Sequence, residues 1–358
     1  MKPGFPILAF ILTTAGLAFA QNSQTVLAKP GAETASTPDR NWTPPKTAWG
    51  DPDLQGIYTT DDLNGVPLQR PKEFGDRRFL TEDEYAARSK EVKSERSTID
   101  TGIRPTTGFW AKVKGVDAAA APAQWIEYAQ HASHLTSLIV DPPDGRVPPL
   151  TPEGEARRKA QPNYYNLRPA SYLDLSMYDR CITRGVTGSY FPSIYGNGSE
   201  IFQAPGVVAI TTEMVHETRI IPLDGRPHTG PGLRSYMGSP RGHWEGNTLV
   251  VETTNFIGGK IDVGGVPYSD DLKLIERFTR VAPDVIDYKV TIDDPKTFTA
   301  PWTVEFPVRH EPGYRIFEYA CHEGNHAMHN RLSAARALDR EDAAKAAAAV
   351  EKQQAEPK

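Results

Sequence analysis

Val285-Ile286-Asp287-Tyr288-Lys289-Val290-Thr291-Ile292-Asp293 decides the fold, because apolar and polar residues alternate along most of its length. The stretch at 302–308, Trp-Thr-Val-Glu-Phe-Pro-Val, largely repeats this pattern. A period of two places alternate side chains on opposite faces of a strand. Both segments therefore predict strands with one buried face and one wet face, which is typical of an antiparallel sheet.

Turn signals join further short apolar segments on either side of this stretch. Pro205-Gly206 separates 200–204 from 207–212, and Gly246-Asn247 separates 242–245 from 248–254. Such dipeptides between apolar runs predict hairpins. We therefore expect a mainly β (α+β) fold, an antiparallel meander that forms a barrel or strongly curved sheet, with a sandwich as the alternative. Long Pro-rich loops and a few peripheral helices, at 81–95 after a capping box and at 122–132, complete this expectation.

The N-terminus has the pattern of a secretory signal peptide. Lys2 precedes an uncharged apolar run at 5–20, which ends in Ala18-Phe19-Ala20. A small-x-small ending of this kind predicts cleavage before Gln21. We expect a signal peptide at 1–20, a flexible leader at 21–45, a single β-rich globular domain at 46–335 and a polar, Ala-rich tail at 336–358. The chain is predicted to be periplasmic or secreted, without a membrane span or lipid anchor.

The composition limits the partners that we expect and suggests the redox state of the cysteines. A formal net charge of −5 offers no basic stripe, so no nucleic-acid partner is expected. The chain has 2 cysteines, Cys181 and Cys321. In an oxidising compartment they predict a disulfide, which the chain-entropy model values at roughly 4 to 5 kcal/mol for a loop of about 140 residues. Two buried free thiols, or a thiol activated by His322, are the alternatives.

His322-Glu323-Gly324-Asn325-His326 matches the H-E-x-x-H pattern of zinc hydrolases. On a helix this spacing aims two imidazoles at one zinc ion, and His329 would add a third. Gly324 and Asn325 are poor helix formers, however, which favours a turn with local hydrogen bonds. A zinc cofactor therefore stays a secondary hypothesis, with His322, His326 and His329 as its candidate ligands.

Two other segments carry candidate site residues. His216 and Glu217 are candidates for an acid–base pair, alongside His322 and Glu323, although a solvated salt-bridge turn explains their spacing equally well. Candidate ligand-binding residues are Arg219, His243, Tyr195 and Tyr319. Alternation places His243 and Glu245 on one side of a strand and Trp244 on the other, with Trp244 expected to anchor the core.

Several quoted runs resemble a large family of secreted bacterial proteins of unknown function. They are 138–146 with 148–153, then 220–228, 243–256 and 319–325. The resemblance spans roughly residues 45–335 and implies export and a shared fold, with no activity to carry over. In that family the position of His326 is usually an aromatic residue such as Tyr, and this departure weakens the zinc hypothesis.

The leading hypothesis is an exported protein that binds a small, partly apolar molecule, with or without acid–base chemistry by His and Glu. A metal-dependent hydrolase that uses His322, Glu323 and His326 is one alternative, and a non-catalytic envelope interaction protein is another. The sequence does not fix the ligand or the oligomeric state.

Overall fold

The computed structural model describes residues 42–100, 127–161 and 168–355. The predicted signal peptide, most of the predicted leader and the first half of the predicted 122–132 helix lie outside these ranges. Residues 127–132 are not helical. Within the described ranges, no helix combines the length and the hydrophobicity that crossing a bilayer requires.

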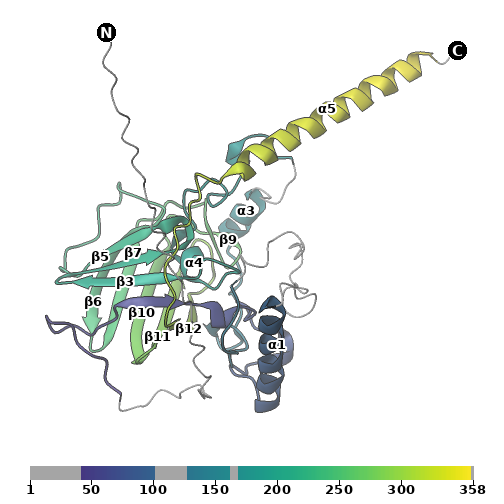
Figure 1. Cartoon of the computed structure of the whole chain (residues 1–358). Coiled ribbons are helices and arrows are strands. Elements are labelled where there is room, and N and C mark those ends of the chain that lie inside the picture. The colour runs from purple at the N-terminus through teal and green to yellow at the C-terminus, as the bar shows by residue number, and fades with distance from the viewer. Residues whose placement is uncertain (1–41, 101–126, 162–167, 356–358) are drawn as a thin grey trace, which may run out of the picture. The chain divides into compact units, whose positions relative to one another are not determined.

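One antiparallel sheet dominates the chain, as expected (Figure 1). Its strands run in the order β5-β4-β3-β1-β12-β11-β10-β7-β6, and β2 also pairs with β12. Both predicted two-residue turns connect hairpins, and Gly206 and Gly246 have φ values of +76° and +60°. The strands are β1 (Gly56–Thr59), β2 (Ile139–Asp141), β3 (Ser199–Ala204), β4 (Val207–Thr212), β5 (Thr218–Pro222), β6 (Ser239–Glu245), β7 (Thr248–Thr254), β10 (Lys273–Ala282), β11 (Val285–Asp293) and β12 (Trp302–His310), with a separate pair β8 (Asp262–Val263) and β9 (Val266–Pro267).

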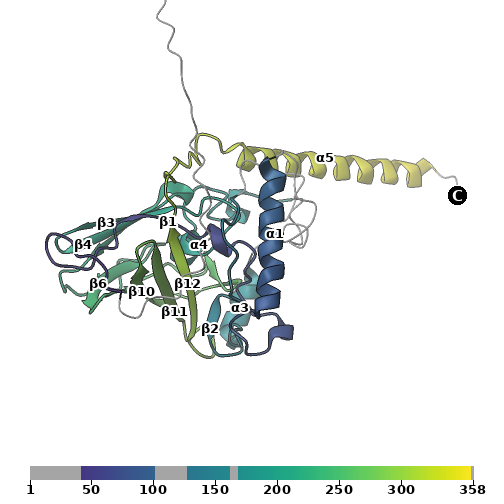
Figure 2. The same ribbon diagram turned by 60° about the horizontal axis from the view of Figure 1, so that its bottom comes forward.

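The sheet is strongly curled (Figure 2), and its edge strands β5 and β6 contact each other, which makes the barrel nearly closed. Gly242 on β6 marks the approach, because a Cβ atom there would lie 2.6 Å from Leu223 and 2.8 Å from Ile221. Any side chain at this position would have to displace the Leu223 and Ile221 side chains that face it. The predicted barrel or strongly curved sheet is therefore confirmed.

The interior holds the predicted apolar faces. On β11 and β12 the inward side chains are at most 1 % exposed, and aromatic rings fill much of the space. Trp244 is partly buried against this core. The largest fully buried apolar side chains on the strands of the main sheet are Trp302, Tyr58, Tyr288, Phe278 and Phe306.

Among the described residues, one buried ion pair interrupts this apolar interior. Arg219 on β5 donates two hydrogen bonds to Glu276 on β10, at 2.9 Å and 2.5 Å. Tyr288 on β11 donates a third to the same carboxylate at 3.1 Å. Both charged side chains are almost completely buried. The bidentate guanidinium compensates the buried carboxylate across the barrel.

Helices occupy the connections and the C-terminus. They are α1 (Glu82–Asp100), α3 (Pro152–Ala160), α4 (Gly185–Tyr190) and α5 (His326–Ala355), with 3-10 turns η1 (Asp61–Leu63), η2 (Lys72–Phe74), η4 (Tyr172–Asp174) and η5 (Met214–His216). The predicted capping box starts α1, since Thr81 and Glu84 exchange hydrogen bonds. α5 crosses the predicted boundary at 335/336, because the Ala-rich sequence favours helix throughout.

Candidate functional site

The chain leaves β12 at one end of the barrel and continues as residues 311–325, which we call the strap. Residues 317–320 form no strand, so no sheet partner holds them. Side chains of other segments hold the strap instead: the Phe317 N–H donates to Glu213 at 2.9 Å and the Tyr314 hydroxyl donates to the same carboxylate at 2.5 Å.

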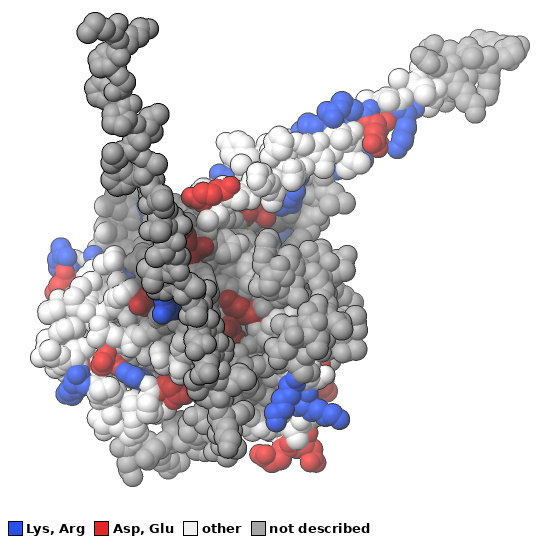
Figure 3. Space-filling model, viewed as in Figure 1, with Lys and Arg blue, Asp and Glu red and all other residues white. Residues whose placement is uncertain are grey.

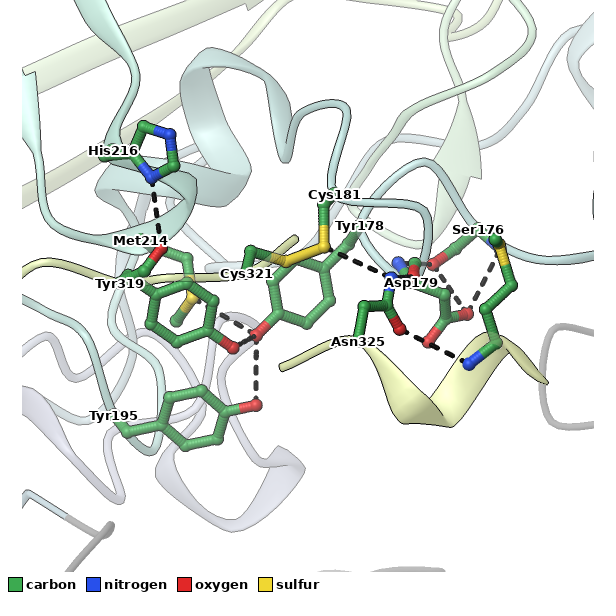
Figure 4. The surroundings of a disulfide bond; sticks show 11 residues. Ser176, Tyr178, Asp179, Cys181, Tyr195, Met214, His216, Tyr319, Cys321 and Asn325 are labelled. Atoms are coloured by element: carbon green, nitrogen blue, oxygen red, sulfur yellow. Dashed lines mark hydrogen bonds between the residues drawn. A yellow bond between two sulfur atoms is a disulfide. The ribbon is translucent and has the colours of Figure 1, made fainter. Parts of the chain in front are cut away.

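The predicted disulfide between Cys181 and Cys321 is confirmed, and it fixes the far part of the strap. Cys181 is 4 % exposed, whereas Cys321 is only partly buried. The backbone of Cys181 has a φ of +55°, a conformation that non-glycine residues rarely adopt. The bond therefore joins a buried, conformationally unusual loop to a more exposed segment (Figure 4).

Three tyrosine hydroxyls meet beside the disulfide, and we call Tyr178, Tyr195 and Tyr319 the tyrosine cluster (Figure 4). The Tyr178 hydroxyl lies 2.6 Å from that of Tyr319 and 3.0 Å from that of Tyr195. Burial, followed by the neighbouring Tyr195, raises the pKa of Tyr178. Tyr178 therefore stays neutral. The cluster links the strap to two loops, and it contains both tyrosines predicted to bind ligand.

His216 lies next to this cluster and is oriented by the strap. Its Nδ1 is 3.0 Å from the Tyr319 carbonyl oxygen. Because a carbonyl only accepts, Nδ1 must carry the proton, and a neutral ring then leaves Nε2 as an acceptor. The backbone of Val215 and His216 has φ values of +59° and +44°. Such conformations are costly and often occur at functional sites.

Glu217 faces a different partner from His216. It accepts a hydrogen bond of 2.5 Å from the Thr183 hydroxyl. Burial raises the pKa of Glu217, and the hydrogen bond from Thr183 opposes that shift. The two residues predicted as an acid–base pair are thus adjacent but engaged separately.

Of the remaining predicted ligand-binding residues, Arg219 lies inside the barrel, paired with Glu276, and His243 lies on its outer surface. His243 is 3.1 Å from Glu245, on the side opposite Trp244, as the alternation predicts. The structure therefore separates these two residues from the tyrosine cluster.

The zinc-like motif is split between a turn and a helix. α5 begins at His326, so His322 and Glu323 precede it. This outcome agrees with the poor helix propensity of Gly324 and Asn325. In the part of the chain that the structure describes, no three His, Cys, Asp or Glu side chains converge as a metal ion requires, and this holds for His322, His326 and His329.

A second group of side chains lies near the strap, and the sequence does not predict it. Asp61, Glu127 and Glu213, which we call the carboxyl cluster, come from three distant parts of the chain. Asn197 joins two of them: its amide donates to Asp61 at 2.9 Å, and its backbone N–H donates to Glu127 at 3.0 Å. Among the described residues, the hydrogen-bond partners of these carboxyls include no Lys, Arg or His.

Protons rather than cations therefore neutralise part of this cluster. A carboxyl group that is buried near a second carboxylate favours its protonated, neutral form. Burial, reinforced by the charge of Glu127, raises the pKa of Asp61 to about 9. The Tyr314 hydroxyl, 3.3 Å from Glu127, connects this pair to Glu213 and to the strap.

A cleft of about 430 Å³ lies along the first half of the strap. Tyr314 is both part of its lining and a partner of the carboxyl cluster, and Phe317 offers a side chain that is 68 % exposed. The lining combines aromatic, acidic and basic residues: Glu311, Pro312, Gly313, Tyr314, Arg315 and Phe317.

No local signal in the sequence links Asp61, Glu127, Glu213 and Tyr314, because about 65 to 100 residues separate consecutive members. Only the tertiary fold makes them neighbours. No protein-family model, curated protein or solved structure matches this chain.

Proposed function

We propose that this chain is an exported protein that binds a small, partly apolar molecule in the cleft along the strap. The observation that carries the proposal is that Glu213 holds two lining residues in place. It accepts hydrogen bonds from the Tyr314 hydroxyl and from the backbone N–H of Phe317. A buried carboxylate thus fixes two aromatic residues beside the opening, which lowers the entropy that ligand binding would cost.

The size and lining of the cleft support this proposal. Ligand pockets are typically about 300–1,000 Å³ and combine apolar surface with a few fixed polar groups. Here Phe317 supplies exposed aromatic surface, and Glu311 and Arg315 supply charge. The interior of the barrel, by contrast, is occupied by large aromatic side chains.

The carboxyl cluster favours ligands that donate hydrogen bonds or carry positive charge. It lies directly behind Tyr314, and its carboxyl groups have no basic hydrogen-bond partner among the described residues. Glu311 adds a further acidic group to the lining. We therefore expect aromatic amines to bind better than aromatic carboxylates of the same size.

Ligand-observed NMR with a fragment set tests this directly, if aromatic amines, alcohols and carboxylates are equally represented. Binding of the best fragments should weaken by at least about tenfold in Phe317→Ala, which corresponds to about 1.4 kcal/mol. Phe202→Ala is the matched control, because Phe202 is also exposed, at 47 %, but lies on β3. Unchanged binding in Phe317→Ala, or no fragment that binds, would refute the proposal.

Export has its own support and its own test. The pattern at 1–20 and the disulfide both fit an oxidising compartment. On the face shown in Figure 3, acidic and basic side chains of the described residues are interspersed rather than gathered by sign. We expect the mature protein recovered outside the cytoplasm to begin at Gln21, which N-terminal mass spectrometry measures. An intact Met1 in that fraction would contradict cleavage.

A further inference from the structure

The second half of the strap, residues 318–325, is held by few contacts. Tyr319 contributes its hydroxyl to Tyr178 and its carbonyl oxygen to His216. Most side chains of this half are exposed, and none belongs to the buried core. The disulfide through Cys321 is its only covalent attachment to the loop at 178–183. Its position therefore depends strongly on that bond.

Asn325 connects the disulfide to the start of α5. Its side-chain oxygen accepts from the Met328 N–H at 3.3 Å, which caps the helix. Its side-chain amide donates to the Cys181 sulfur at 3.3 Å and to the Asp179 carbonyl at 2.8 Å (Figure 4). The N-terminus of a 30-residue helix therefore lies beside this sulfur.

These contacts distinguish the two sulfur atoms chemically. A hydrogen-bond donor and a helix N-terminus both stabilise a thiolate. Both act on Cys181, which is buried. Cys321 is the more exposed partner. An attacking thiol thus meets Cys321 more easily, while Cys181 is the better leaving group.

We propose that the Cys181–Cys321 disulfide is a redox-sensitive latch, which a dithiol reductant opens by attack at Cys321 to release residues 318–324, between Phe317 and the helix cap Asn325. In the first step, a reductant thiolate forms a mixed disulfide with Cys321, and Cys181 leaves as a thiolate. The second reductant thiol then attacks the mixed disulfide and expels Cys321. The protein gains two electrons and two protons, and the dithiol becomes a disulfide.

Opening the latch frees Tyr319 from Tyr178 while Tyr314 and Phe317 keep their bonds to Glu213. The barrel, which makes no covalent contact with the strap other than through the chain at His310, stays folded. If the cleft binds ligand as proposed above, reduction loosens only its far side. The latch itself is testable without any ligand, so the two proposals can fail separately.

Native protein treated with dithiothreitol, without denaturant, tests the opening. Alkylation with a polyethylene-glycol maleimide counts free thiols over time, and chymotrypsin reports the strap through cleavage after Tyr319. We expect complete reduction within minutes to an hour, unchanged far-UV circular dichroism, and cleavage after Tyr319 that is at least tenfold faster. A disulfide that persists in the native protein, or reduction that leaves this cleavage rate unchanged, overturns the proposal.

Asn325→Asp tests the assigned leaving group. Aspartate still caps α5 but cannot donate to Cys181 and places a negative charge beside it. We expect reduction to slow by about tenfold, since a less stable thiolate leaves more slowly. In the Cys321→Ser background, the thiolate absorbance of Cys181 at about 240 nm should appear at higher pH when Asn325→Asp is added.

Asn330→Asp is the control for added charge, because Asn330 is exposed on the same helix. It should leave both the reduction rate and the thiolate titration unchanged. Equal effects of the two substitutions would assign the change to surface charge and overturn the role of Asn325. The disulfide-intact variants keep the reduction measurement valid if Cys321→Ser fails to fold.

Discussion

The barrel interior and the region under the strap both bury carboxyl groups, but they neutralise them differently. In the barrel, the guanidinium of Arg219 compensates Glu276. Under the strap, Asp61, Glu127 and Glu213 gather with hydroxyl and amide donors, and burial with the nearby charge of Glu127 raises the pKa of Asp61 to about 9, so Asp61 keeps a proton. The stability that a fixed ion pair contributes is insensitive to pH near neutrality, whereas that of a carboxyl group kept protonated by burial is not. The first arrangement is suited to holding a fold, and the second to responding to a ligand or to pH.

The largest expected effect follows from breaking the ion pair in the barrel. Glu276→Ala leaves the Arg219 guanidinium buried without a counter-charge and should lower the free energy of unfolding by about 3–5 kcal/mol. Urea denaturation followed by circular dichroism measures this loss. The double substitution Arg219→Met with Glu276→Leu should recover most of it, because the interior then buries no charge. A loss below about 1 kcal/mol for Glu276→Ala would show that Arg219 reaches water.

Asp61→Asn is expected to raise the free energy of unfolding near neutral pH, by less than Glu276→Ala lowers it. In the folded chain the pKa of Asp61 is about 9, above its ordinary value of 3.8, so the folded state retains a proton that the unfolded state has released between these values. The contribution of Asp61 to the free energy of unfolding is therefore fully present below about pH 4. It is lost as the pH rises toward 9, by up to about 1.4 kcal/mol per pH unit.

The side-chain amide introduced by Asp61→Asn mimics the protonated acid, so the wild-type loss should be absent in this variant. Between pH 6 and 8 we expect the wild type to lose about 2 kcal/mol relative to the variant. Unfolding free energies from urea titrations at several pH values measure the difference. Parallel pH profiles for the two proteins would contradict the raised pKa of Asp61.

Tyr314→Phe should have a modest effect on stability, because it weakens the attachment of the strap and leaves the barrel unchanged. The substitution keeps the aromatic lining of the cleft and removes one donor to Glu213, which should cost about 1.5 kcal/mol. Tyr172→Phe is the control, since Tyr172 is 52 % exposed. Thermal unfolding compares the two, and equal melting temperatures would mean that Glu213 finds another donor.

The smallest effect is expected on the outer surface of the barrel. His243→Ala removes an exposed contact with Glu245 and should change the free energy of unfolding by less than about 0.5 kcal/mol. The same urea assay applies. A larger loss would show that His243 has a role on this face that its contacts do not reveal.

The two regions also differ in how far the sequence predicts them. Local sequence patterns predict the barrel. Alternation at 285–293 and 302–308 assigns the buried faces, and Gly206 and Gly246 mark the hairpins. The disulfide follows from there being two cysteines. The tyrosine cluster is predicted only in part, since Tyr195 and Tyr319 stand out in aromatic-rich or motif-bearing segments, whereas Tyr178 does not.

The carboxyl cluster could not be predicted, because its members become neighbours only after the sheet has formed. Asp61 follows β1, Glu213 follows β4, and Tyr314 follows β12, and the pairing of β1 with β3 and β12 brings these strand ends together. The position of Arg219 could not be predicted from its local sequence either. Its segment suggests a solvent-facing site, but the register of β5 turns it inward toward Glu276.

The approach of β5 and β6 at Gly242 has a consequence for motion. These two strands meet through side chains, yet they are the two ends of the hydrogen-bonded strand order. Amide groups on the facing edges of β5 and β6 lack the inter-strand backbone hydrogen bonds that protect the other strands, so local opening should begin here. Native-state deuterium uptake is therefore expected to be fastest on the facing edges of β5 and β6 and slowest in β10, β11 and β12.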